Sequence, residues 1–143
     1  MPLRTGATLD RFTNRGKGFL PGLIGVRVTA LAENRLDMEL DIRAELLAPN
    51  GYLHAASVVA LADTACGFAC IAHLPEGAEN FTTIELKTNF FGTAREGTLA
   101  CVATPAHLGR NTQVWDATVR DKETTKTLAL FRCTQMVLWP RGG

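Results

Sequence analysis

The chain has 143 residues, of which 46% are hydrophobic and 20% are charged, and its formal net charge is +1. These values are typical of one globular domain and argue against a disordered or fibrous chain. A net charge so close to zero supplies no long-range field to attract DNA or an anionic membrane, so we expect neither nucleic acid nor membrane as a partner.

The first third of the chain predicts a short helix and then two strands. Residues 8–16 fit a short N-terminal helix, which residues 19–22 ("FLPG") should break. Apolar and polar residues alternate on both sides of residues 33–35, which indicates two half-buried antiparallel strands within 24–46, joined by a tight turn. Residues 47–51 ("LAPNG") should form a loop, because Pro49 and the Asn50-Gly51 pair disfavour helix and strand alike.

From His54 onward the spacing of apolar residues changes to three and four, which predicts one long helix. Pro75 and Gly77 should end that helix. Many of its residues are small, which allows close backbone approach. The residues expected on its buried face are Val58, Leu61, Ala62, Ala65, Phe68, Ala69 and Ala72.

The remaining residues read as four strands over roughly 81–91, 97–108, 112–121 and 126–138. Their separators are short enough for hairpins or near-hairpins. One apolar helix and five or six strands bury their apolar faces best if a curved antiparallel sheet wraps around the helix. We therefore predict a single α+β domain over residues 1–143 with the hot-dog fold, its core covering about 22–138 after the short N-terminal helix.

The four cysteines predict reduced thiols in the core. Cys66, Cys70, Cys101 and Cys133 stand in apolar surroundings and form no C-x-x-C pair. Together with a start that lacks the apolar segment of a signal peptide, they favour a cytoplasmic location. The spacing of Cys66, Cys70 and His73 raises the question of zinc, but no fourth ligand lies nearby, so packing is favoured and no metal is expected.

The most informative single residue is Asp63, a lone carboxylate in the middle of the apolar helix. An aspartate there is unfavourable by helix propensity and costly if it is buried without a partner. The helix could turn this position to solvent, or the carboxylate could cap a backbone amide. Alternatively, an apolar pocket without a cation would raise the pKa of the carboxyl group, which suits a general base or nucleophile near neutral pH.

His54 stands nine residues before Asp63, which places the two side chains on roughly opposite sides of an ideal helix. They are therefore not expected to share a site within one chain. If both serve one reaction, a second copy of the chain must bring them together.

Three segments together resemble the hot-dog acyl-CoA thioesterases, specifically the phenylacetate-pathway (PaaI-like) branch. They are "GYLHAASVVALADTACGFA" (51–69), "TTIELKTNFFGTAREGTL" (82–99) and "HLGRNTQVWDATVRD" (107–121). The family combines a His-Gly-Gly turn with a helical aspartate nine residues after the histidine, a strand with the pattern T-x-E/D, and a Gly-Arg turn. The likeness extends over about residues 22–138.

The resemblance implies a role for five residues. Asp63 would activate water or attack the thioester carbonyl, and the backbone N–H of Ala55 would be the oxyanion donor, aided by the helix dipole. His54 would orient the loop or bind near the thioester, Asn50 would be a polar contact, and Thr83 would place a hydroxyl near the attacking water.

The chain departs from the family at one point, since His-Ala-Ala replaces His-Gly-Gly. Alanine keeps the amide donor, but its methyl group narrows the approach and excludes a positive φ. The resemblance also places Gly109 and Arg110 beside the nucleotide end of CoA, where an arginine can pair with phosphate. Lys87 and Arg95 are further candidates for CoA binding.

These features together predict an acyl-CoA thioesterase that acts on a small or medium acyl group, with an aromatic one as a candidate. The mechanism requires no cofactor, and the expected assembly is a homodimer joined edge to edge, with sites at subunit interfaces. The resemblance to the family implies that two such dimers pair again as a homotetramer. Two alternatives stay open at this point: a hot-dog acyl-thioester dehydratase or hydratase, and a non-catalytic acyl-CoA-binding protein.

Overall fold

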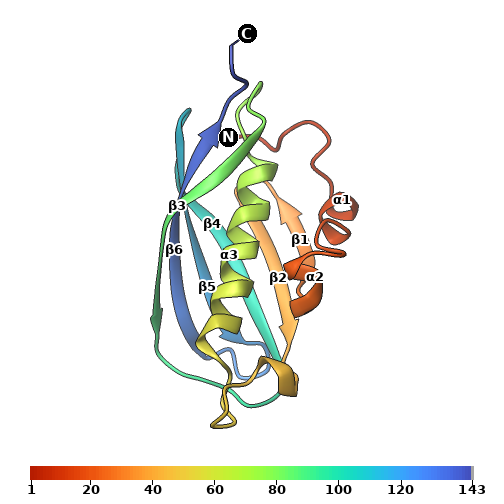
Figure 1. The fold of residues 1–143 in the computed structure, drawn as a ribbon, viewed down its shortest axis with the longest axis vertical. Coiled ribbons are helices and arrows are strands. Elements are labelled where there is room, and N and C mark those ends of the chain that lie inside the picture. The colour runs from red at the N-terminus through yellow and green to blue at the C-terminus, as the bar shows by residue number, and fades with distance from the viewer. Residues whose placement is uncertain (143) are drawn as a thin grey trace.

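The centre of the structure is one 18-residue helix, α3, enclosed by a curved six-stranded sheet in the computed structural model, which describes residues 1–142 (Figure 1). This arrangement confirms the expected hot-dog fold. The helices are α1 (Leu9–Thr13), α2 (Leu20–Ile24) and α3 (Ala55–Ala72), with one 3-10 turn, η1 (Ala44–Leu46). The strands are β1 (Arg27–Ala32), β2 (Arg35–Asp41), β3 (Asn80–Phe90), β4 (Thr98–Leu108), β5 (Thr112–Asp121) and β6 (Thr127–Leu138).

The sheet is antiparallel throughout and has the order β1-β2-β4-β5-β6-β3. The hairpins β1–β2, β4–β5 and β5–β6 confirm the sequence prediction. A near-hairpin between β3 and β4 was also expected, and there the prediction is wrong: β3 pairs with β6 at the far edge, and β4 pairs with β2 and β5. Residues 92–97 instead run beneath the start of α3, where the Leu53 N–H donates to the Ala94 carbonyl at 2.9 Å.

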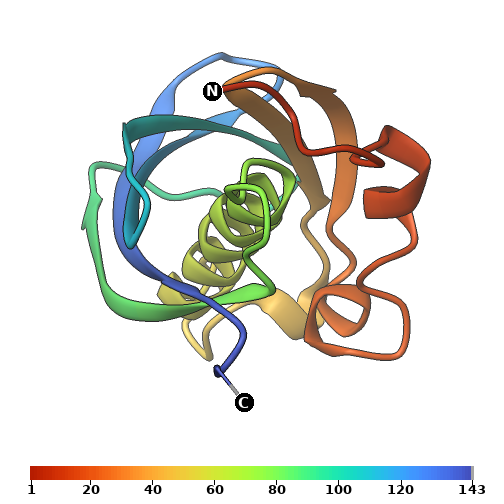
Figure 2. The ribbon, with the colours of Figure 1, turned by 90° about the horizontal axis from the view of Figure 1, so that it is seen from above.

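The N-terminal segment differs from the prediction at its second turn. Helix α1 confirms the expected short helix, but residues 19–22 do not only end it, because Leu20 starts α2 with Pro21 in its first turn. Proline fits there, since the first amides of a helix have no intrahelical acceptor. Arg43 then holds the other end of α2 by donating to the carbonyls of Leu23 and Ile24. Figure 2 shows both helices beside β1, outside the curve of the sheet.

Helix α3 is buried along most of its length because the sheet curves around it (Figure 2). Leu61, Ala62, Ala65 and Ala69 are fully buried, as the apolar spacing predicts. Among the described residues, α3 is the only helix long and apolar enough to cross a membrane, and its burial by the sheet explains that composition without a membrane. The four cysteines are free and buried among the core residues.

His73 closes the C-terminal end of α3 and is fully buried. Its Nδ1 lies 2.7 Å from the Ala69 carbonyl, and its Nε2 accepts the Asn34 N–H at 2.8 Å. The Gln113 side chain in turn donates to the His73 carbonyl at 2.9 Å. A neutral ring with its proton on Nδ1 satisfies both nitrogens, so both are used within the fold.

Burial lowers the pKa of His73 below its usual value of 6.5. The unfolded chain takes up a proton near pH 6.5, whereas the folded chain does so only at lower pH, so the free energy of unfolding should decrease as pH falls below about 6.5. Urea denaturation from pH 7.5 to 5 measures this decrease. His73→Asn should cost about 2–4 kcal/mol at pH 7.5 and flatten the pH dependence, because two hydrogen bonds and core packing are lost.

The control is His107→Asn, because His107 is exposed on β4. This substitution should leave both the stability at pH 7.5 and its pH dependence unchanged. A pH dependence that persists undiminished in His73→Asn would contradict a buried neutral histidine as its source.

Candidate active site

Asp63 lies on α3, half-buried, and its Oδ1 atom is fully buried without a hydrogen-bond partner among the described residues. The carboxylate therefore neither caps a backbone amide nor forms an ion pair in this part of the chain. Burial raises the pKa of Asp63 above its ordinary value of 3.8. A buried carboxylate with an unused oxygen is costly to folding, and such groups concentrate at functional sites.

The packing of α3 shows which element Asp63 faces. A side chain on Gly67 would lie 3.1 Å from the ring of Phe81, so this part of α3 sits directly against β3. Asp63 is one helical turn before Gly67 and hence about 6 Å along the axis, on nearly the same face. Two residues along β3 from Phe81 cover roughly the same distance. This register places Thr83 level with Asp63.

The strand pairing also places the Thr83 side chain on the helix side of the sheet. Phe81 and Thr83 stand opposite Val137 and Gln135 of β6, both of which are buried. Thr88 likewise stands opposite the buried Phe131. Gln135 and Thr88 also carry buried oxygens without a partner among residues 1–142, on the side of the sheet that faces α3.

The N-terminal end of α3 presents a free backbone donor. His54 is the N-cap, and its Nδ1 accepts the Ala56 N–H at 2.9 Å. The Ala55 N–H has no acceptor within residues 1–142, and it lies at the positive end of the helix dipole. Because its Nδ1 accepts a hydrogen bond, the neutral His54 ring carries its proton on Nε2, directed away from the cap.

The replacement of His-Gly-Gly by His-Ala-Ala causes no backbone strain. Among the described residues, the only non-glycine residues with positive φ are Asn34 and Thr125, so both Ala55 and Ala56 have a conformation that alanine favours. The methyl group of Ala55 lines a cavity of about 200 Å³ next to the free amide. The walls of this cavity are mostly apolar and include Leu53, Val58, Phe90 and Leu128.

His54 and Asp63 are nine residues apart on one helix, which corresponds to roughly 13 Å of rise. One chain therefore supplies the amide donor and the carboxylate at two separate levels along α3. Asn50 does not join either level, because it is exposed and its Oδ1 accepts the Tyr52 N–H at 3.1 Å within the loop.

The four residues considered for CoA binding lie in three places. Gly109 and Arg110 form the β4–β5 turn, where the Arg110 guanidinium stacks on Trp139 at 4.2 Å. Arg95 stacks on Tyr52 at 4.1 Å, beside the start of α3. Lys87 stands opposite Arg132 on the outer face of the sheet, away from α3. The fold thus keeps Gly109 with Arg110 and separates both from Arg95 and Lys87.

Two features of the site were missed from the sequence. The apolar cavity beside Ala55 combines residues from the loop, α3, β3 and β6, which no local pattern brings together. Thr88 and Gln135 are polar residues at strand positions that face the core, where the alternating pattern calls for apolar residues. This departure from the pattern can be seen in the sequence and could have marked them as candidates.

Comparison with known proteins gives consistent matches. The family model of the thioesterase superfamily matches residues 50–128, more than half of the chain. The 1,4-dihydroxy-2-naphthoyl-CoA hydrolase of Listeria monocytogenes is 29% identical over 111 residues, which is 78% of this chain and 89% of that protein. The crystal structure of thioesterase HI1161 from Haemophilus influenzae superposes with a TM-score of 0.89 at 28% identity, covering 96% of this chain and 95% of the other.

The PaaI protein of Escherichia coli, from the phenylacetic acid degradation operon, superposes with a TM-score of 0.74 at 24% identity. The match covers 86% of this chain and 84% of that one, and at this identity it establishes likeness of fold.

Proposed function

Since the chain belongs to the thioesterase superfamily, we propose that it hydrolyses an acyl-CoA to the free acid and CoA. The observation that carries this proposal is the Asp63 carboxylate, which is half-buried and has no hydrogen-bond partner for its Oδ1 among residues 1–142. Burial raises the pKa of Asp63, and a carboxylate with a raised pKa is a better base than an exposed one.

In the proposed reaction, the Ala55 N–H donates to the thioester oxygen and stabilises the negative charge that develops there. Asp63 either takes a proton from water, whose oxygen attacks the carbonyl carbon, or attacks that carbon itself to form an anhydride that water then hydrolyses. In both routes the C–S bond breaks and CoA leaves as a thiolate. His54 positions the donor by capping Ala56, and Thr83 is level with the carboxylate to orient the water. This chemistry draws on no metal or redox cofactor.

The acyl group is proposed from the cavity beside Ala55. Its lining by Leu53, Val58, Phe90 and Leu128 favours an apolar acyl group of modest size. The relative from Listeria monocytogenes is named for a naphthoyl-CoA, so an aromatic acyl group is our first candidate. Thiol release from a panel of aliphatic and aromatic acyl-CoAs, including phenylacetyl-CoA and benzoyl-CoA, tests this choice. Tight binding of CoA esters without thiol release would instead favour a non-catalytic binding protein.

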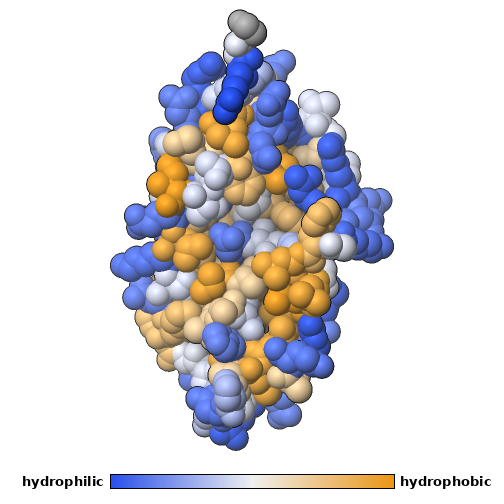
Figure 3. All heavy atoms as spheres, in the orientation of Figure 1, coloured by the Kyte–Doolittle hydropathy of each residue, from blue (hydrophilic) through white to orange (hydrophobic). Residues whose placement is uncertain are grey.

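We further propose a homodimer, because one chain holds its donor and its carboxylate at different levels along α3. We expect the two chains to contact each other through β3, since this strand pairs only with β6 in the described sheet and its other edge is open. Its exposed apolar residues include Ile84, Leu86 and Phe90. Figure 3 shows apolar side chains along the β3 side of the molecule. Pairing of two β3 edges would cover this surface and the open backbone groups.

A second pairing of dimers would give the tetramer, and we propose that the protein acts in the cytoplasm.

Ile84→Lys should raise the dissociation constant of the dimer at least about tenfold, because it would place a charge on the apolar β3 surface that the proposed dimer buries. Ile84 is the unpaired residue of the β3 bulge and is 55% exposed, so the monomer should tolerate lysine there. Light scattering across a dilution series measures the effect, and thiol release should fall with the dimer fraction.

Thr29→Lys is a matched control, since Thr29 is the exposed bulge residue of the opposite edge strand, β1. It should leave the assembly unchanged. If Ile84→Lys stays dimeric at every concentration, β3 is not the interface. A monomer with full turnover would contradict a site shared between two chains.

A further inference from the structure

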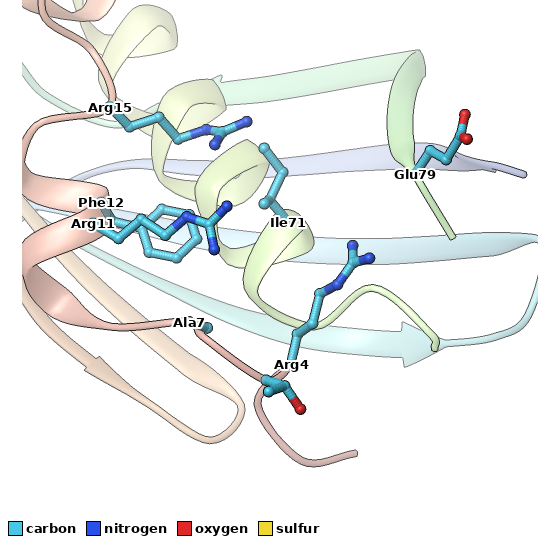
Figure 4. Close-up of a pocket in the computed structure, with 8 residues that line it drawn as sticks. Arg4, Ala7, Arg11, Phe12, Arg15, Ile71 and Glu79 are labelled. Atoms are coloured by element: carbon cyan, nitrogen blue, oxygen red, sulfur yellow. The ribbon is translucent and has the colours of Figure 1, made fainter. Parts of the chain in front are cut away.

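Three arginines from the N-terminal segment converge on one cavity of about 390 Å³ at the C-terminal end of α3, which we call the arginine pocket (Figure 4). Arg4 precedes α1, Arg11 lies within it, and Arg15 follows it. Phe12 and Ile71 supply apolar wall, and Figure 4 shows the three guanidinium groups gathered around Ile71. The pocket combines concentrated positive charge with an apolar surface.

Within residues 1–142, no carboxylate lies close enough to these arginines to form an ion pair. Four other arginines of the chain each have a carboxylate oxygen within 4 Å, namely Arg27, Arg35, Arg43 and Arg132. Arg4, Arg11 and Arg15 have none among residues 1–142. Glu79 also lines the cavity, but Figure 4 shows it across from the arginines with its carboxylate turned away. Three positive charges therefore face one distant negative charge.

The N-terminal segment that carries the three arginines is attached to the rest of the fold. The Arg4 N–H donates to the Ala72 carbonyl at 2.8 Å, and the Arg4 guanidinium donates to the Ala78 carbonyl at 2.7 Å. Phe12 is buried and packs on Phe68 of α3 at a centroid distance of 5.8 Å, which fixes α1 beneath Arg11 and Arg15. Holding like charges together costs free energy, and a bound anion would offset that cost.

We propose that the arginine pocket binds the phosphate group of a small organic phosphate. Guanidinium groups present paired N–H donors that match phosphate oxygens, and a net charge of two fits a phosphate dianion. The apolar wall of Phe12 and Ile71 provides contact for the organic part. Ile71 is eight residues beyond Asp63, about 12 Å along α3, so the pocket is distinct from the proposed catalytic carboxylate.

Two sources of phosphate share this chemistry. One is the nucleotide end of the CoA thioester, an assignment that rests on the proposed function. The other is a separate organic phosphate that binds independently of turnover. A binding titration followed by kinetics separates the two sources, and the titration can be carried out even if the protein has no activity.

The binding test is calorimetric titration of the full chain at low salt with adenosine 3′,5′-bisphosphate and with inorganic phosphate. Both should bind, and Arg11→Gln together with Arg15→Gln should weaken the bisphosphate at least about tenfold, because charge-assisted hydrogen bonds are lost. Both side chains are exposed, so the melting temperature should change little. Arg120→Gln is the matched control, since Arg120 is exposed on β5 without a carboxylate partner in the described chain.

The absence of binding by the wild type, or equal affinities in the double variant and Arg120→Gln, would overturn the proposal. If binding is weakened, kinetics with an acyl-CoA identify the source. A raised KM at unchanged kcat assigns the pocket to CoA, whereas an unchanged KM assigns it to a separate phosphate ligand. Either outcome supports the phosphate site, and an inactive enzyme that still binds would count against the proposed function alone.

Discussion

Asp63→Asn should lower kcat for acyl-CoA hydrolysis by about 10²- to 10⁴-fold, the range typical of losing a general base. Asparagine keeps the size of the side chain, but it lacks the negative charge and basicity with which a carboxylate activates water. It also does not form an anhydride. It also removes a buried charge that has no partner at Oδ1, so the folded state should be at least as stable as the wild type. Continuous detection of the released thiol measures kcat, and thermal denaturation measures stability.

The pH profile of the wild type provides a second measurement of the same group. Burial raises the pKa of Asp63, so its carboxyl group is protonated at a higher pH than an exposed aspartate. Activity requires the ionised form, and kcat should therefore decrease on the acid side at a pH above 3.8.

Asp116→Asn is a suitable control, because Asp116 pairs with Arg132 on the outer face of the sheet. It should retain wild-type kcat. Unchanged thiol release by Asp63→Asn would remove the catalytic role of this carboxylate, whatever the other measurements show.

Ala55→Pro should lower kcat by about 10²- to 10³-fold, the usual effect of removing one oxyanion donor. Proline has no backbone N–H, yet it is well tolerated at the first position of a helix, where that group has no intrahelical acceptor. The preceding residue, His54, already has the extended conformation (φ −67°, ψ 135°) that proline requires of its neighbour. The substitution thus removes the donor while the helix start keeps its geometry.

Ala55→Gly is the matched control, since it keeps the N–H and creates the glycine that the family usually has there. Its kcat should stay within a few-fold of the wild type, because the backbone at Ala55 needs no positive φ. Circular dichroism and the melting temperature verify the fold of both variants. If Ala55→Pro hydrolyses acyl-CoA as fast as Ala55→Gly does, the oxyanion donor lies elsewhere.

Much of the fold could be predicted from local pattern because its elements are strongly periodic. The change from alternation to spacings of three and four at His54 marks the start of α3, and Pro75 and Gly77 lie just after its end. The partner of β3 could not be predicted in this way. The segment of residues 92–97 between β3 and β4 is short, which suggested a near-hairpin. In the wrapped sheet, however, β3 lies beside β6. Strand order depends on which edges meet once the sheet curves around the helix, and sequence separation does not determine that.

Local sequence pattern was enough to show that Asp63 is an anomaly in an apolar helix and that His54 lies too far around that helix to reach it. Both conclusions follow from the fixed geometry of an α-helix. The surroundings of these residues depend on the tertiary structure: the buried Oδ1 of Asp63 without a partner among residues 1–142, the free Ala55 N–H beside an apolar cavity, and the burial of His73. It alone also brought Arg4, Arg11 and Arg15 against Ile71, because the docking of the N-terminal segment on α3 joins residues about sixty positions apart. Contacts of that kind depend on packing between elements, which local spacing does not encode.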